Sequence, residues 1–163
     1  MAAAEIIGAA VGVMLLVIVA YVVVGSTLYA AETVTSAQKD LTVQQEARMR
    51  TAFDITDAFN NTASSYIIYA NISNTGNEII GDFKHMDVIV YDQLEKDYQI
   101  CTYDAVDVSP GHWHFIPPSG EFIHPNELDP GESYQVEIFS EGDAPKWFQM
   151  TTANGVYASA FLS

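Results

Sequence analysis

Histidines are the first residues that could carry chemistry. His112 and His114 flank Trp113, and His124 follows ten residues later. On a strand, two residues at this spacing share a face and could bind a metal ion. No carboxylate cluster accompanies them in the sequence. We therefore interpret them as polar residues of a turn-rich region and expect no metal site.

Acidic residues and the single cysteine are the next candidates. Asp54 and Asp57, and Asp104 and Asp107, could be read as paired carboxylates, but each pair stands among ordinary turn acids. A weak calcium site in such loops lacks the spacing of an EF-hand. Cys101 can form no intrachain disulfide, and one thiol excludes a zinc site built on thiolates. Its place in the run YQICTYD favours a buried structural thiol.

Catalytic and cofactor signatures are missing from the sequence. It contains no phosphate-binding loop, no dinucleotide fingerprint and no nucleophile elbow. We therefore predict a protein that is not an enzyme and has no cofactor. Two N-glycosylation sequons occur, at Asn60 and Asn71. Asn71 lies within a predicted strand, so Asn60, expected in a loop, is the better candidate if the domain is exported.

An apolar segment at the N-terminus dominates the organisation of the chain. Residues 6–24 carry no charge, which is the length that a helix needs to cross about 30 Å of hydrocarbon. A cleaved secretion signal would need a basic start and a shorter apolar run. No proline interrupts residues 1–109, and near-helical apolar spacing continues beyond the segment. We expect one helix over roughly residues 4–50, lipid-like first and then amphipathic, about 70 Å long.

This helix supplies the predicted site residues, which would face lipid or copies of the same helix. The small residues Gly8 and Gly12 form a pair at which two helix backbones could approach closely. Glu5 would interact favourably with the helix dipole as a first-turn carboxylate. The complete set is Glu5, Ile6, Ile7, Gly8, Gly12, Leu15, Leu16, Ile18, Val22 and Val24.

The remainder of the chain is strongly acidic. Residues 51–163 hold seventeen acidic and three basic residues, out of a net charge of -15 for the whole chain. Such a domain would be repelled by phosphate backbones, so we expect no nucleic acid partner. The positive-inside rule gives almost no orientation, because basic residues are absent before the segment and distant after it. The acidic, cysteine-poor and sequon-bearing composition favours a position outside the cell membrane.

Short alternating segments separated by turns predict an all-β domain over residues 52–163, after an N-terminal helical region of residues 1–51. Strands are expected near residues 66–72, 86–91 and 133–139, with a C-terminal hairpin around Asn154-Gly155. The proline-rich stretch PGHWHFIPPSGEFIHPNELDPGE should carry one or two short edge strands. Seven or eight such strands favour an immunoglobulin-like antiparallel sandwich. The fold class is therefore α+β, a long hydrophobic helix followed by this sandwich.

The same segments resemble the archaellin superfamily. The resemblance rests on AEIIGAAVGVMLLVIVAYVVVGSTLYAAETVTSAQKDL, NISNTGNEIIGDFKHMDVIVYD, LDPGESYQVEIF and TTANGVYASAFL. Within the superfamily the chain looks most like the F-type accessory protein of the archaellum. The resemblance implies a helix in the cell membrane and an oligomeric sandwich in the pseudoperiplasm. There the sandwich would contact the S-layer as a stator, with other archaellum components as partners.

Two alternatives stay open. Archaellins and archaeal type IV pilins share the helix-plus-sandwich plan and polymerise through their N-terminal helices, so the chain could be an extracellular filament subunit. If Met1 is a processed terminus, Glu5 lies where pilins carry their assembly acid. If Met1 is the unprocessed start of the chain, the stator interpretation is favoured. A membrane-anchored module that captures a solute is the third and weakest interpretation.

Overall fold

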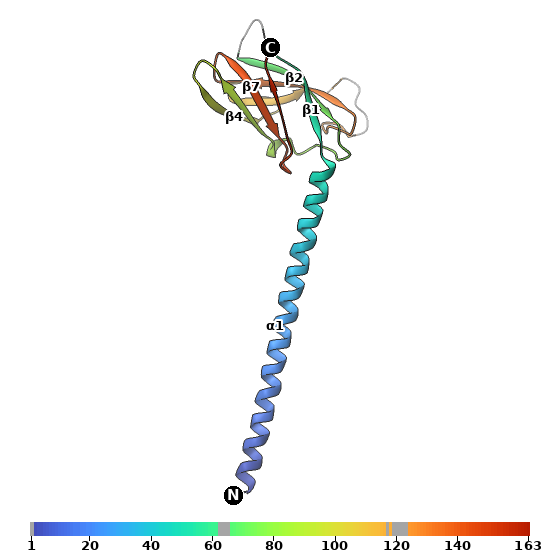
Figure 1. Ribbon diagram of the computed structural model, residues 1–163, viewed down its shortest axis with the longest axis vertical. Helices are drawn as coiled ribbons and strands as arrows, with labels where there is room; N and C mark the ends of the chain where they lie inside the picture. Colours follow the sequence, from blue (N-terminus) through green and yellow to red (C-terminus); the bar gives the residue numbers. More distant parts are fainter. Residues whose placement is uncertain (1, 62–65, 117, 119–123) are drawn as a thin grey trace. The chain divides into compact units, whose positions relative to one another are not determined.

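The N-terminal segment forms one continuous helix. The computed structural model describes residues 2–61, 66–116, 118 and 124–163. Helix α1 runs from Ala2 to Arg50, which confirms the predicted long helix (Figure 1). The chain divides into two compact units, Met1–Gln44 and Gln45–Ser163. The last turn of α1 therefore belongs to the same unit as the β domain.

Eight strands and one short 3-10 helix, η1, follow α1. Their bounds are β1 (Phe53–Asn60), β2 (Ile67–Asn74), η1 (Phe83–His85), β3 (Asp87–Asp92), β4 (Asp97–Tyr103), β5 (His112–Ile116), β6 (Ser133–Phe139), β7 (Pro145–Thr151) and β8 (Tyr157–Phe161). The strands expected near residues 66–72, 86–91 and 133–139 are confirmed as β2, β3 and β6. The predicted α+β class is confirmed as well.

The strands form two layers of four. Hydrogen bonding connects them in the order β1-β2-β6-β5-β4-β3-β7-β8. All pairings are antiparallel except that of β4 with β5, which joins the layers through two residue pairs, Thr102↔His112 and Tyr103↔Trp113. The layers β1-β2-β6-β5 and β4-β3-β7-β8 reproduce the immunoglobulin order ABED and C′CFG. The expected immunoglobulin-like sandwich is thus confirmed.

The C-terminal hairpin forms where Asn-Gly predicts it. Gly155 lies between β7 and β8 with φ of 81°, a value that glycine adopts without a Cβ clash. The amide of Thr152 donates to the carbonyl of Val156 at 2.8 Å and closes the turn. This hairpin places β8 at the edge of the second layer, where the amide of Ser163 just beyond it donates to the carbonyl of Ala58 in β1 at 3.4 Å.

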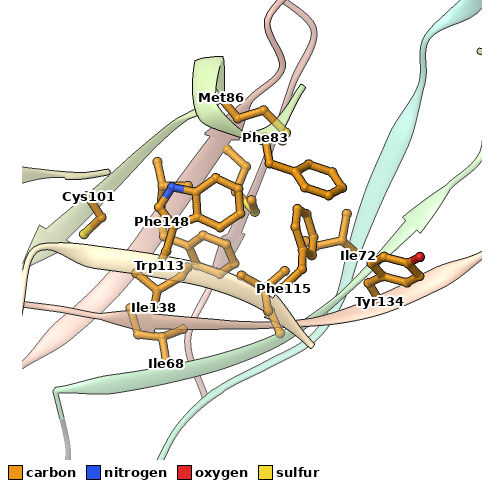
Figure 2. Close-up of a cluster of buried hydrophobic side chains, with 14 of the residues drawn as sticks. Ile68, Ile72, Phe83, Met86, Cys101, Trp113, Phe115, Tyr134, Ile138 and Phe148 are labelled. Carbon is orange, nitrogen blue, oxygen red and sulfur yellow. The ribbon is translucent and has the colours of Figure 1, made fainter. Parts of the chain in front are cut away.

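The core lies between the two layers and is rich in aromatic rings. Trp113 of β5, Tyr134 of β6 and Phe148 of β7 are almost fully buried. Figure 2 shows Phe115 among these side chains, and its ring centroid lies 4.3 Å from that of Phe83 and 5.2 Å from that of Trp113. Both layers contribute through alternate residues, as the period of a strand requires.

Two local predictions concern Asn60 and the proline-rich stretch. Asn60 is not in a loop, because pairing of Asn60 with Ile68 extends β1 to that residue. In the proline-rich stretch, β5 pairs with β6 over five residues and with β4 over two. It is therefore an edge strand of its layer, apart from that short bridge. Residues 117 and 119–123 of the same stretch lie outside the described residues.

Candidate functional site: the N-terminal helix and the surfaces of the sandwich

The first half of α1 is apolar on all sides. Its large side chains lie open to the surroundings, with Leu16 71% exposed and Ile6 69% exposed. Apart from its own stretch of helix backbone, an added Cβ at Gly8 or Gly12 would meet nothing within 4 Å. By length and composition this is the one helix among the described residues that could cross a membrane. Apolar surface of this extent has to be covered by lipid or by other protein.

The predicted residues of this segment all lie on α1. Glu5 is the acidic residue of the first turn, next to the positive end of the helix dipole. Gly8 and Gly12 are one turn apart and so share a face of the helix. The remaining predicted residues are large aliphatic side chains of the exposed surface: Ile6, Ile7, Leu15, Leu16, Ile18, Val22 and Val24.

The second half of α1 holds several hydroxyl side chains that bond within the helix. Thr33 donates to the carbonyl of Tyr29 at 2.9 Å, and Thr35 donates to that of Ala31 at 2.8 Å. Ser26, Thr27 and Thr42 bond to preceding carbonyls in the same way. Because these donors are satisfied internally, the helix surface can pack against an apolar partner with no lost hydrogen bond from them.

The last turn of α1 is attached to the β domain by backbone hydrogen bonds. The carbonyl of Arg50 accepts from the amide of Asn77 at 2.8 Å. The carbonyl of Ala52 accepts from Thr75 at 3.0 Å and from Gly76 at 2.9 Å. The turn after β2 therefore supplies donors to carbonyls at the C-terminal end of the helix, groups that have no partner within the helix itself.

Gly76 allows this attachment because it has no side chain. An added Cβ would lie 2.5 Å from both the amide nitrogen of Ala52 and the carbonyl oxygen of Arg50. On the other side, Asn154 of the C-terminal hairpin donates to the hydroxyl of Thr51 at 2.6 Å. Two turns distant in sequence thus hold the end of the helix. The segment SNTGN signalled a turn, but nothing in it indicated this contact.

The outer face of the β1-β2-β6-β5 layer carries a row of paired polar side chains. Tyr69, Glu137 and His114 are register neighbours on β2, β6 and β5. His114 Nε2 lies 3.1 Å from Glu137 Oε2. Burial, followed by the hydrogen bond with Glu137 and the charge of that carboxylate, raises the pKa of Tyr69. Glu137 is thus the partner of both Tyr69 and His114 Nε2, whereas the buried Nδ1 of His114 has no hydrogen-bond partner.

Both sequon asparagines lie on strands. Asn71 is on the same outer face, where its amide nitrogen is 3.4 Å from a carboxylate oxygen of Asp57. The amide nitrogen of Asn60 donates to the carbonyl of Pro145 at 3.0 Å and is half-buried. A glycan at Asn60 would have to displace that bond. Thr62, which completes the first sequon, lies outside the described residues.

The three candidate histidines do not converge. His112 lies beside Ser109, His114 beside Glu137, and His124 Nδ1 lies 2.9 Å from Asp129 Oδ1. Among the described residues, no group of three or more histidine, cysteine, aspartate or glutamate side chains could hold a metal ion.

Of the two candidate acid pairs, Asp104 and Asp107 shape a turn, whereas Asp54 and Asp57 lie on β1 and not in the turn that was expected. Asp104 accepts from the amides of Val106 and Asp107, and these two hydrogen bonds lower the pKa of Asp104. Asp107 accepts from the amide of Ser109, which in turn lowers its pKa. Carboxylates held ionised by backbone donors stabilise a loop and are poor proton donors.

Cys101 is buried in the core, as predicted. Burial, with the negative charge of Glu141 as a second cause, raises the pKa of its thiol to about 12. A buried thiol with so high a pKa is a poor nucleophile.

Comparison with known proteins adds a likeness of fold. No protein-family model matches the sequence, and no curated protein matches it. The archaellum periplasmic stator protein FlaG from Sulfolobus acidocaldarius is similar in structure, with 21% identity and a TM-score of 0.50. That likeness covers 69% of the present chain and 99% of the other. A chain of the FlaF and FlaG stator complex from the same organism gives 21% identity and a TM-score of 0.49 over 68% and 87% of the two chains. The sandwich is thus similar in fold to a known archaellum stator protein.

Proposed function

We propose that this chain is a non-enzymatic structural component of the archaellum, anchored in the cell membrane by α1 and acting as a stator outside it. One observation carries the proposal: a fully exposed apolar helix whose last turn is hydrogen-bonded into an immunoglobulin-like sandwich. A stator must resist load, and the bonds of Arg50 and Ala52 to residues 75–77 would hold the last turn of α1 to the β domain. The likeness of fold to FlaG supports the same role.

In this role the sandwich would transmit force from the helix to the cell envelope. The S-layer is the envelope partner that the proposal names, and copies of the chain or other archaellum proteins would complete the assembly. The acidic surface suits an exported domain, because a large net charge favours solubility.

A filament subunit is the alternative function. The observation that favours it is the small-residue pair Gly8 and Gly12, where an added Cβ would meet nothing within 4 Å apart from its own stretch of helix backbone. Such a pair would let α1 pack closely against copies of itself in a filament core. Glu5 would then lie near the N-terminus of a neighbouring subunit.

The two functions are separated by locating the protein in cells. We would shear filaments from whole cells and identify this chain and its N-terminal peptide by mass spectrometry. A stator should stay with the membrane and envelope fraction. Abundant chain in the sheared filaments would instead establish the filament subunit.

Anchoring is tested by placing a charge in the apolar segment. Leu16→Arg should abolish retention in membranes, because arginine at mid-span costs roughly 2.5–3.5 kcal/mol on insertion scales. Leu41→Arg is the matched control, since Leu41 is on the same helix, 58% exposed and beyond the apolar segment. Membrane retention of the Leu16→Arg protein would show that α1 is not the anchor.

S-layer contact needs its own test. Wild-type chain should co-sediment with isolated S-layer sheets and should be released when the sheets are dissolved. Failure to co-sediment, with membrane retention intact, would remove the S-layer from the proposal and leave the anchored protein.

A further inference from the structure

A row of aromatic side chains crosses the outer face of the β4-β3-β7-β8 layer. Its members are Tyr98 of β4, Tyr91 of β3, Trp147 of β7 and Phe161 of β8. Cross-strand pairing places them side by side, with Tyr91 opposite both Tyr98 and Trp147, and Trp147 opposite Phe161. We call these four residues the aromatic row.

The row is open to solvent and encloses a hollow. Tyr98 is 63% exposed and Phe161 is 77% exposed, whereas Tyr91 and Trp147 are half-buried between them. The four side chains line a shallow hollow of about 310 Å³. Exposed apolar surface of this kind marks an interaction site more often than a single exposed residue does.

Ring geometry limits what the hollow can hold. The ring centroids of Tyr91 and Tyr98 are 5.0 Å apart with 47° between the planes. Those of Tyr98 and Trp147 are 6.4 Å apart with 88° between the planes. Rings at such angles do not form the flat platform on which a sugar ring stacks. They line the hollow in more than one orientation, so a small group in it could contact more than one ring.

The electrostatic surroundings select a positive group. The turn between β3 and β4 and the loop between β6 and β7 meet at the end of the row, where Ala144 donates to Asp92 at 2.7 Å and Gln93 donates to Ala144 at 2.9 Å. Four exposed carboxylates stand on these two segments and on the first residue of β4: Glu95, Glu141, Asp143 and Asp97.

Two lysines lie nearby. Lys96 is exposed in the turn between β3 and β4, and Lys146 Nζ is engaged with the carbonyl of Leu162 at 3.3 Å. The four carboxylates therefore leave this end of the layer negative. The face itself is neutral, because the aromatic row and the adjacent row of Ile100, Ile89, Gln149 and Ser159 contain no charged residue.

We propose that the aromatic row is a docking site for a protein segment rich in arginine or lysine, which inserts a cationic side chain among the rings of Tyr91, Tyr98 and Trp147. A cation within about 6 Å of ring centroids is attracted by the ring quadrupoles, most strongly by tryptophan. The neighbouring carboxylates increase the local concentration of such a partner. The hollow offers few polar partners other than the tyrosine hydroxyl groups, which disfavours a ligand that relies on many hydrogen bonds. This inference does not depend on where the chain is anchored.

The chain contains a reporter for the test. Trp147 is half-exposed in the row, whereas Trp113 is fully buried in the core. A ligand at the row should therefore change the fluorescence of Trp147 and leave that of Trp113 unaltered. The probe is a twelve-residue peptide of alternating arginine and glycine, and the neutral control replaces each arginine by glutamine. The full chain is used in uncharged detergent micelles.

Two variants separate binding at the row from diffuse attraction to an acidic protein. Tyr98→Ala removes one ring and should weaken binding of the arginine peptide by about two- to five-fold, the size of one exposed cation–π contact. Tyr157→Ala is the matched control, because Tyr157 is 65% exposed on the same face but pairs with Thr151 at the opposite end of β8. Its affinity for the peptide should equal that of the wild type.

Three results would overturn the proposal. Equal binding by wild type and Tyr98→Ala would assign the attraction to the acidic surface alone. Binding of a neutral oligosaccharide that depends on Tyr98 would make the row a sugar site. A change of oligomeric state in Tyr98→Ala without any peptide binding would make the row an interface between copies.

Discussion

The two outer faces of the sandwich are built from the same alternating pattern and differ in where their side chains find partners. On the β1-β2-β6-β5 face, Glu137 is flanked by Tyr69 and His114, and Ser133 donates to Ser73 at 2.9 Å. On the β4-β3-β7-β8 face, the aromatic row is left open. On the first face these polar side chains pair with one another, and the pairs contribute to stability. The second leaves apolar surface that only another molecule can cover.

The largest effect is expected at Asp92, at the end of the aromatic face. Its buried carboxylate accepts from Leu94 at 2.7 Å, Glu95 at 2.9 Å and Ala144 at 2.7 Å, and so holds the two acidic segments together. Asp92→Ala would leave these donors unpaired and should lower the free energy of unfolding by about 2–4 kcal/mol. Urea titration of the full chain in micelles measures the loss. Asp87→Ala, an exposed acid on the same strand, should change it by less than about 0.5 kcal/mol.

Acid should reproduce part of this loss. Burial by itself raises the pKa of Asp92, but the amides of Glu95, Ala144 and Leu94 outweigh burial and hold the pKa below 3.8. A carboxyl group whose pKa is lower in the folded state stabilises the fold above the unfolded pKa. That contribution disappears as the pH falls below about 4 and through the folded value. Wild type and Asp92→Ala should therefore converge in stability at low pH, and parallel curves down to pH 2 would contradict this role.

Glu137 should give the next largest effect, on the opposite face. Glu137→Ala removes the partner of both Tyr69 and His114 and should cost about 1–3 kcal/mol of unfolding free energy. Gln135→Ala, an exposed neighbour on the same strand, is the matched control and should be nearly neutral. If Glu137→Ala left the free energy of unfolding unchanged, the stability of the domain would not depend on the side-chain pairs of this face.

A small effect on stability is expected at the aromatic row. Phe161→Ser removes a ring that is 77% exposed, so the unfolding free energy should change by about 0.5 kcal/mol or less. The midpoint of urea unfolding measures this, with Tyr134→Ser, whose ring is 1% exposed, as the strongly destabilised reference. A loss above about 2 kcal/mol at Phe161 would show that the row is structural and would remove the contrast between the faces.

Features of the fold that depend on residues close in sequence could be predicted, whereas those that depend on residues distant in sequence could not. The helix, the strand near residues 133–139 and the Asn154-Gly155 hairpin follow from local periodicity and turn chemistry. The end of β1 does not, since Asn60 is placed on a strand by pairing with Ile68 of β2. Tertiary pairing determines the conformation of Asn60, whereas the sequence NNTASS by itself predicts a turn.

The surfaces were harder to anticipate than the elements. Attachment of the helix end needs Gly76 beside Ala52 and Asn154 beside Thr51, contacts between residues 24 and 103 positions apart. The aromatic row requires the register of four strands, since Tyr98 and Phe161 become neighbours of one surface only through Tyr91 and Trp147. Alternation marks each residue as outward-facing, but it does not say which outward residues lie side by side.

The contrast between the two outer faces therefore depends on the register of β4. Thiol labelling can test that register. Cys101 points into the core and Ile100, 67% exposed, points out on the aromatic face. Because burial raises the pKa of the Cys101 thiol to about 12, native wild-type chain should not react with a thiol reagent at pH 8 until denaturant is added. An Ile100→Cys thiol should have an ordinary pKa near 8.5 and should react at once, giving one label per chain. A slip of one residue in β4 would exchange these two positions, so labelling of native wild type, or protection of the new cysteine, would place Tyr98 inside the sandwich and remove it from the aromatic row.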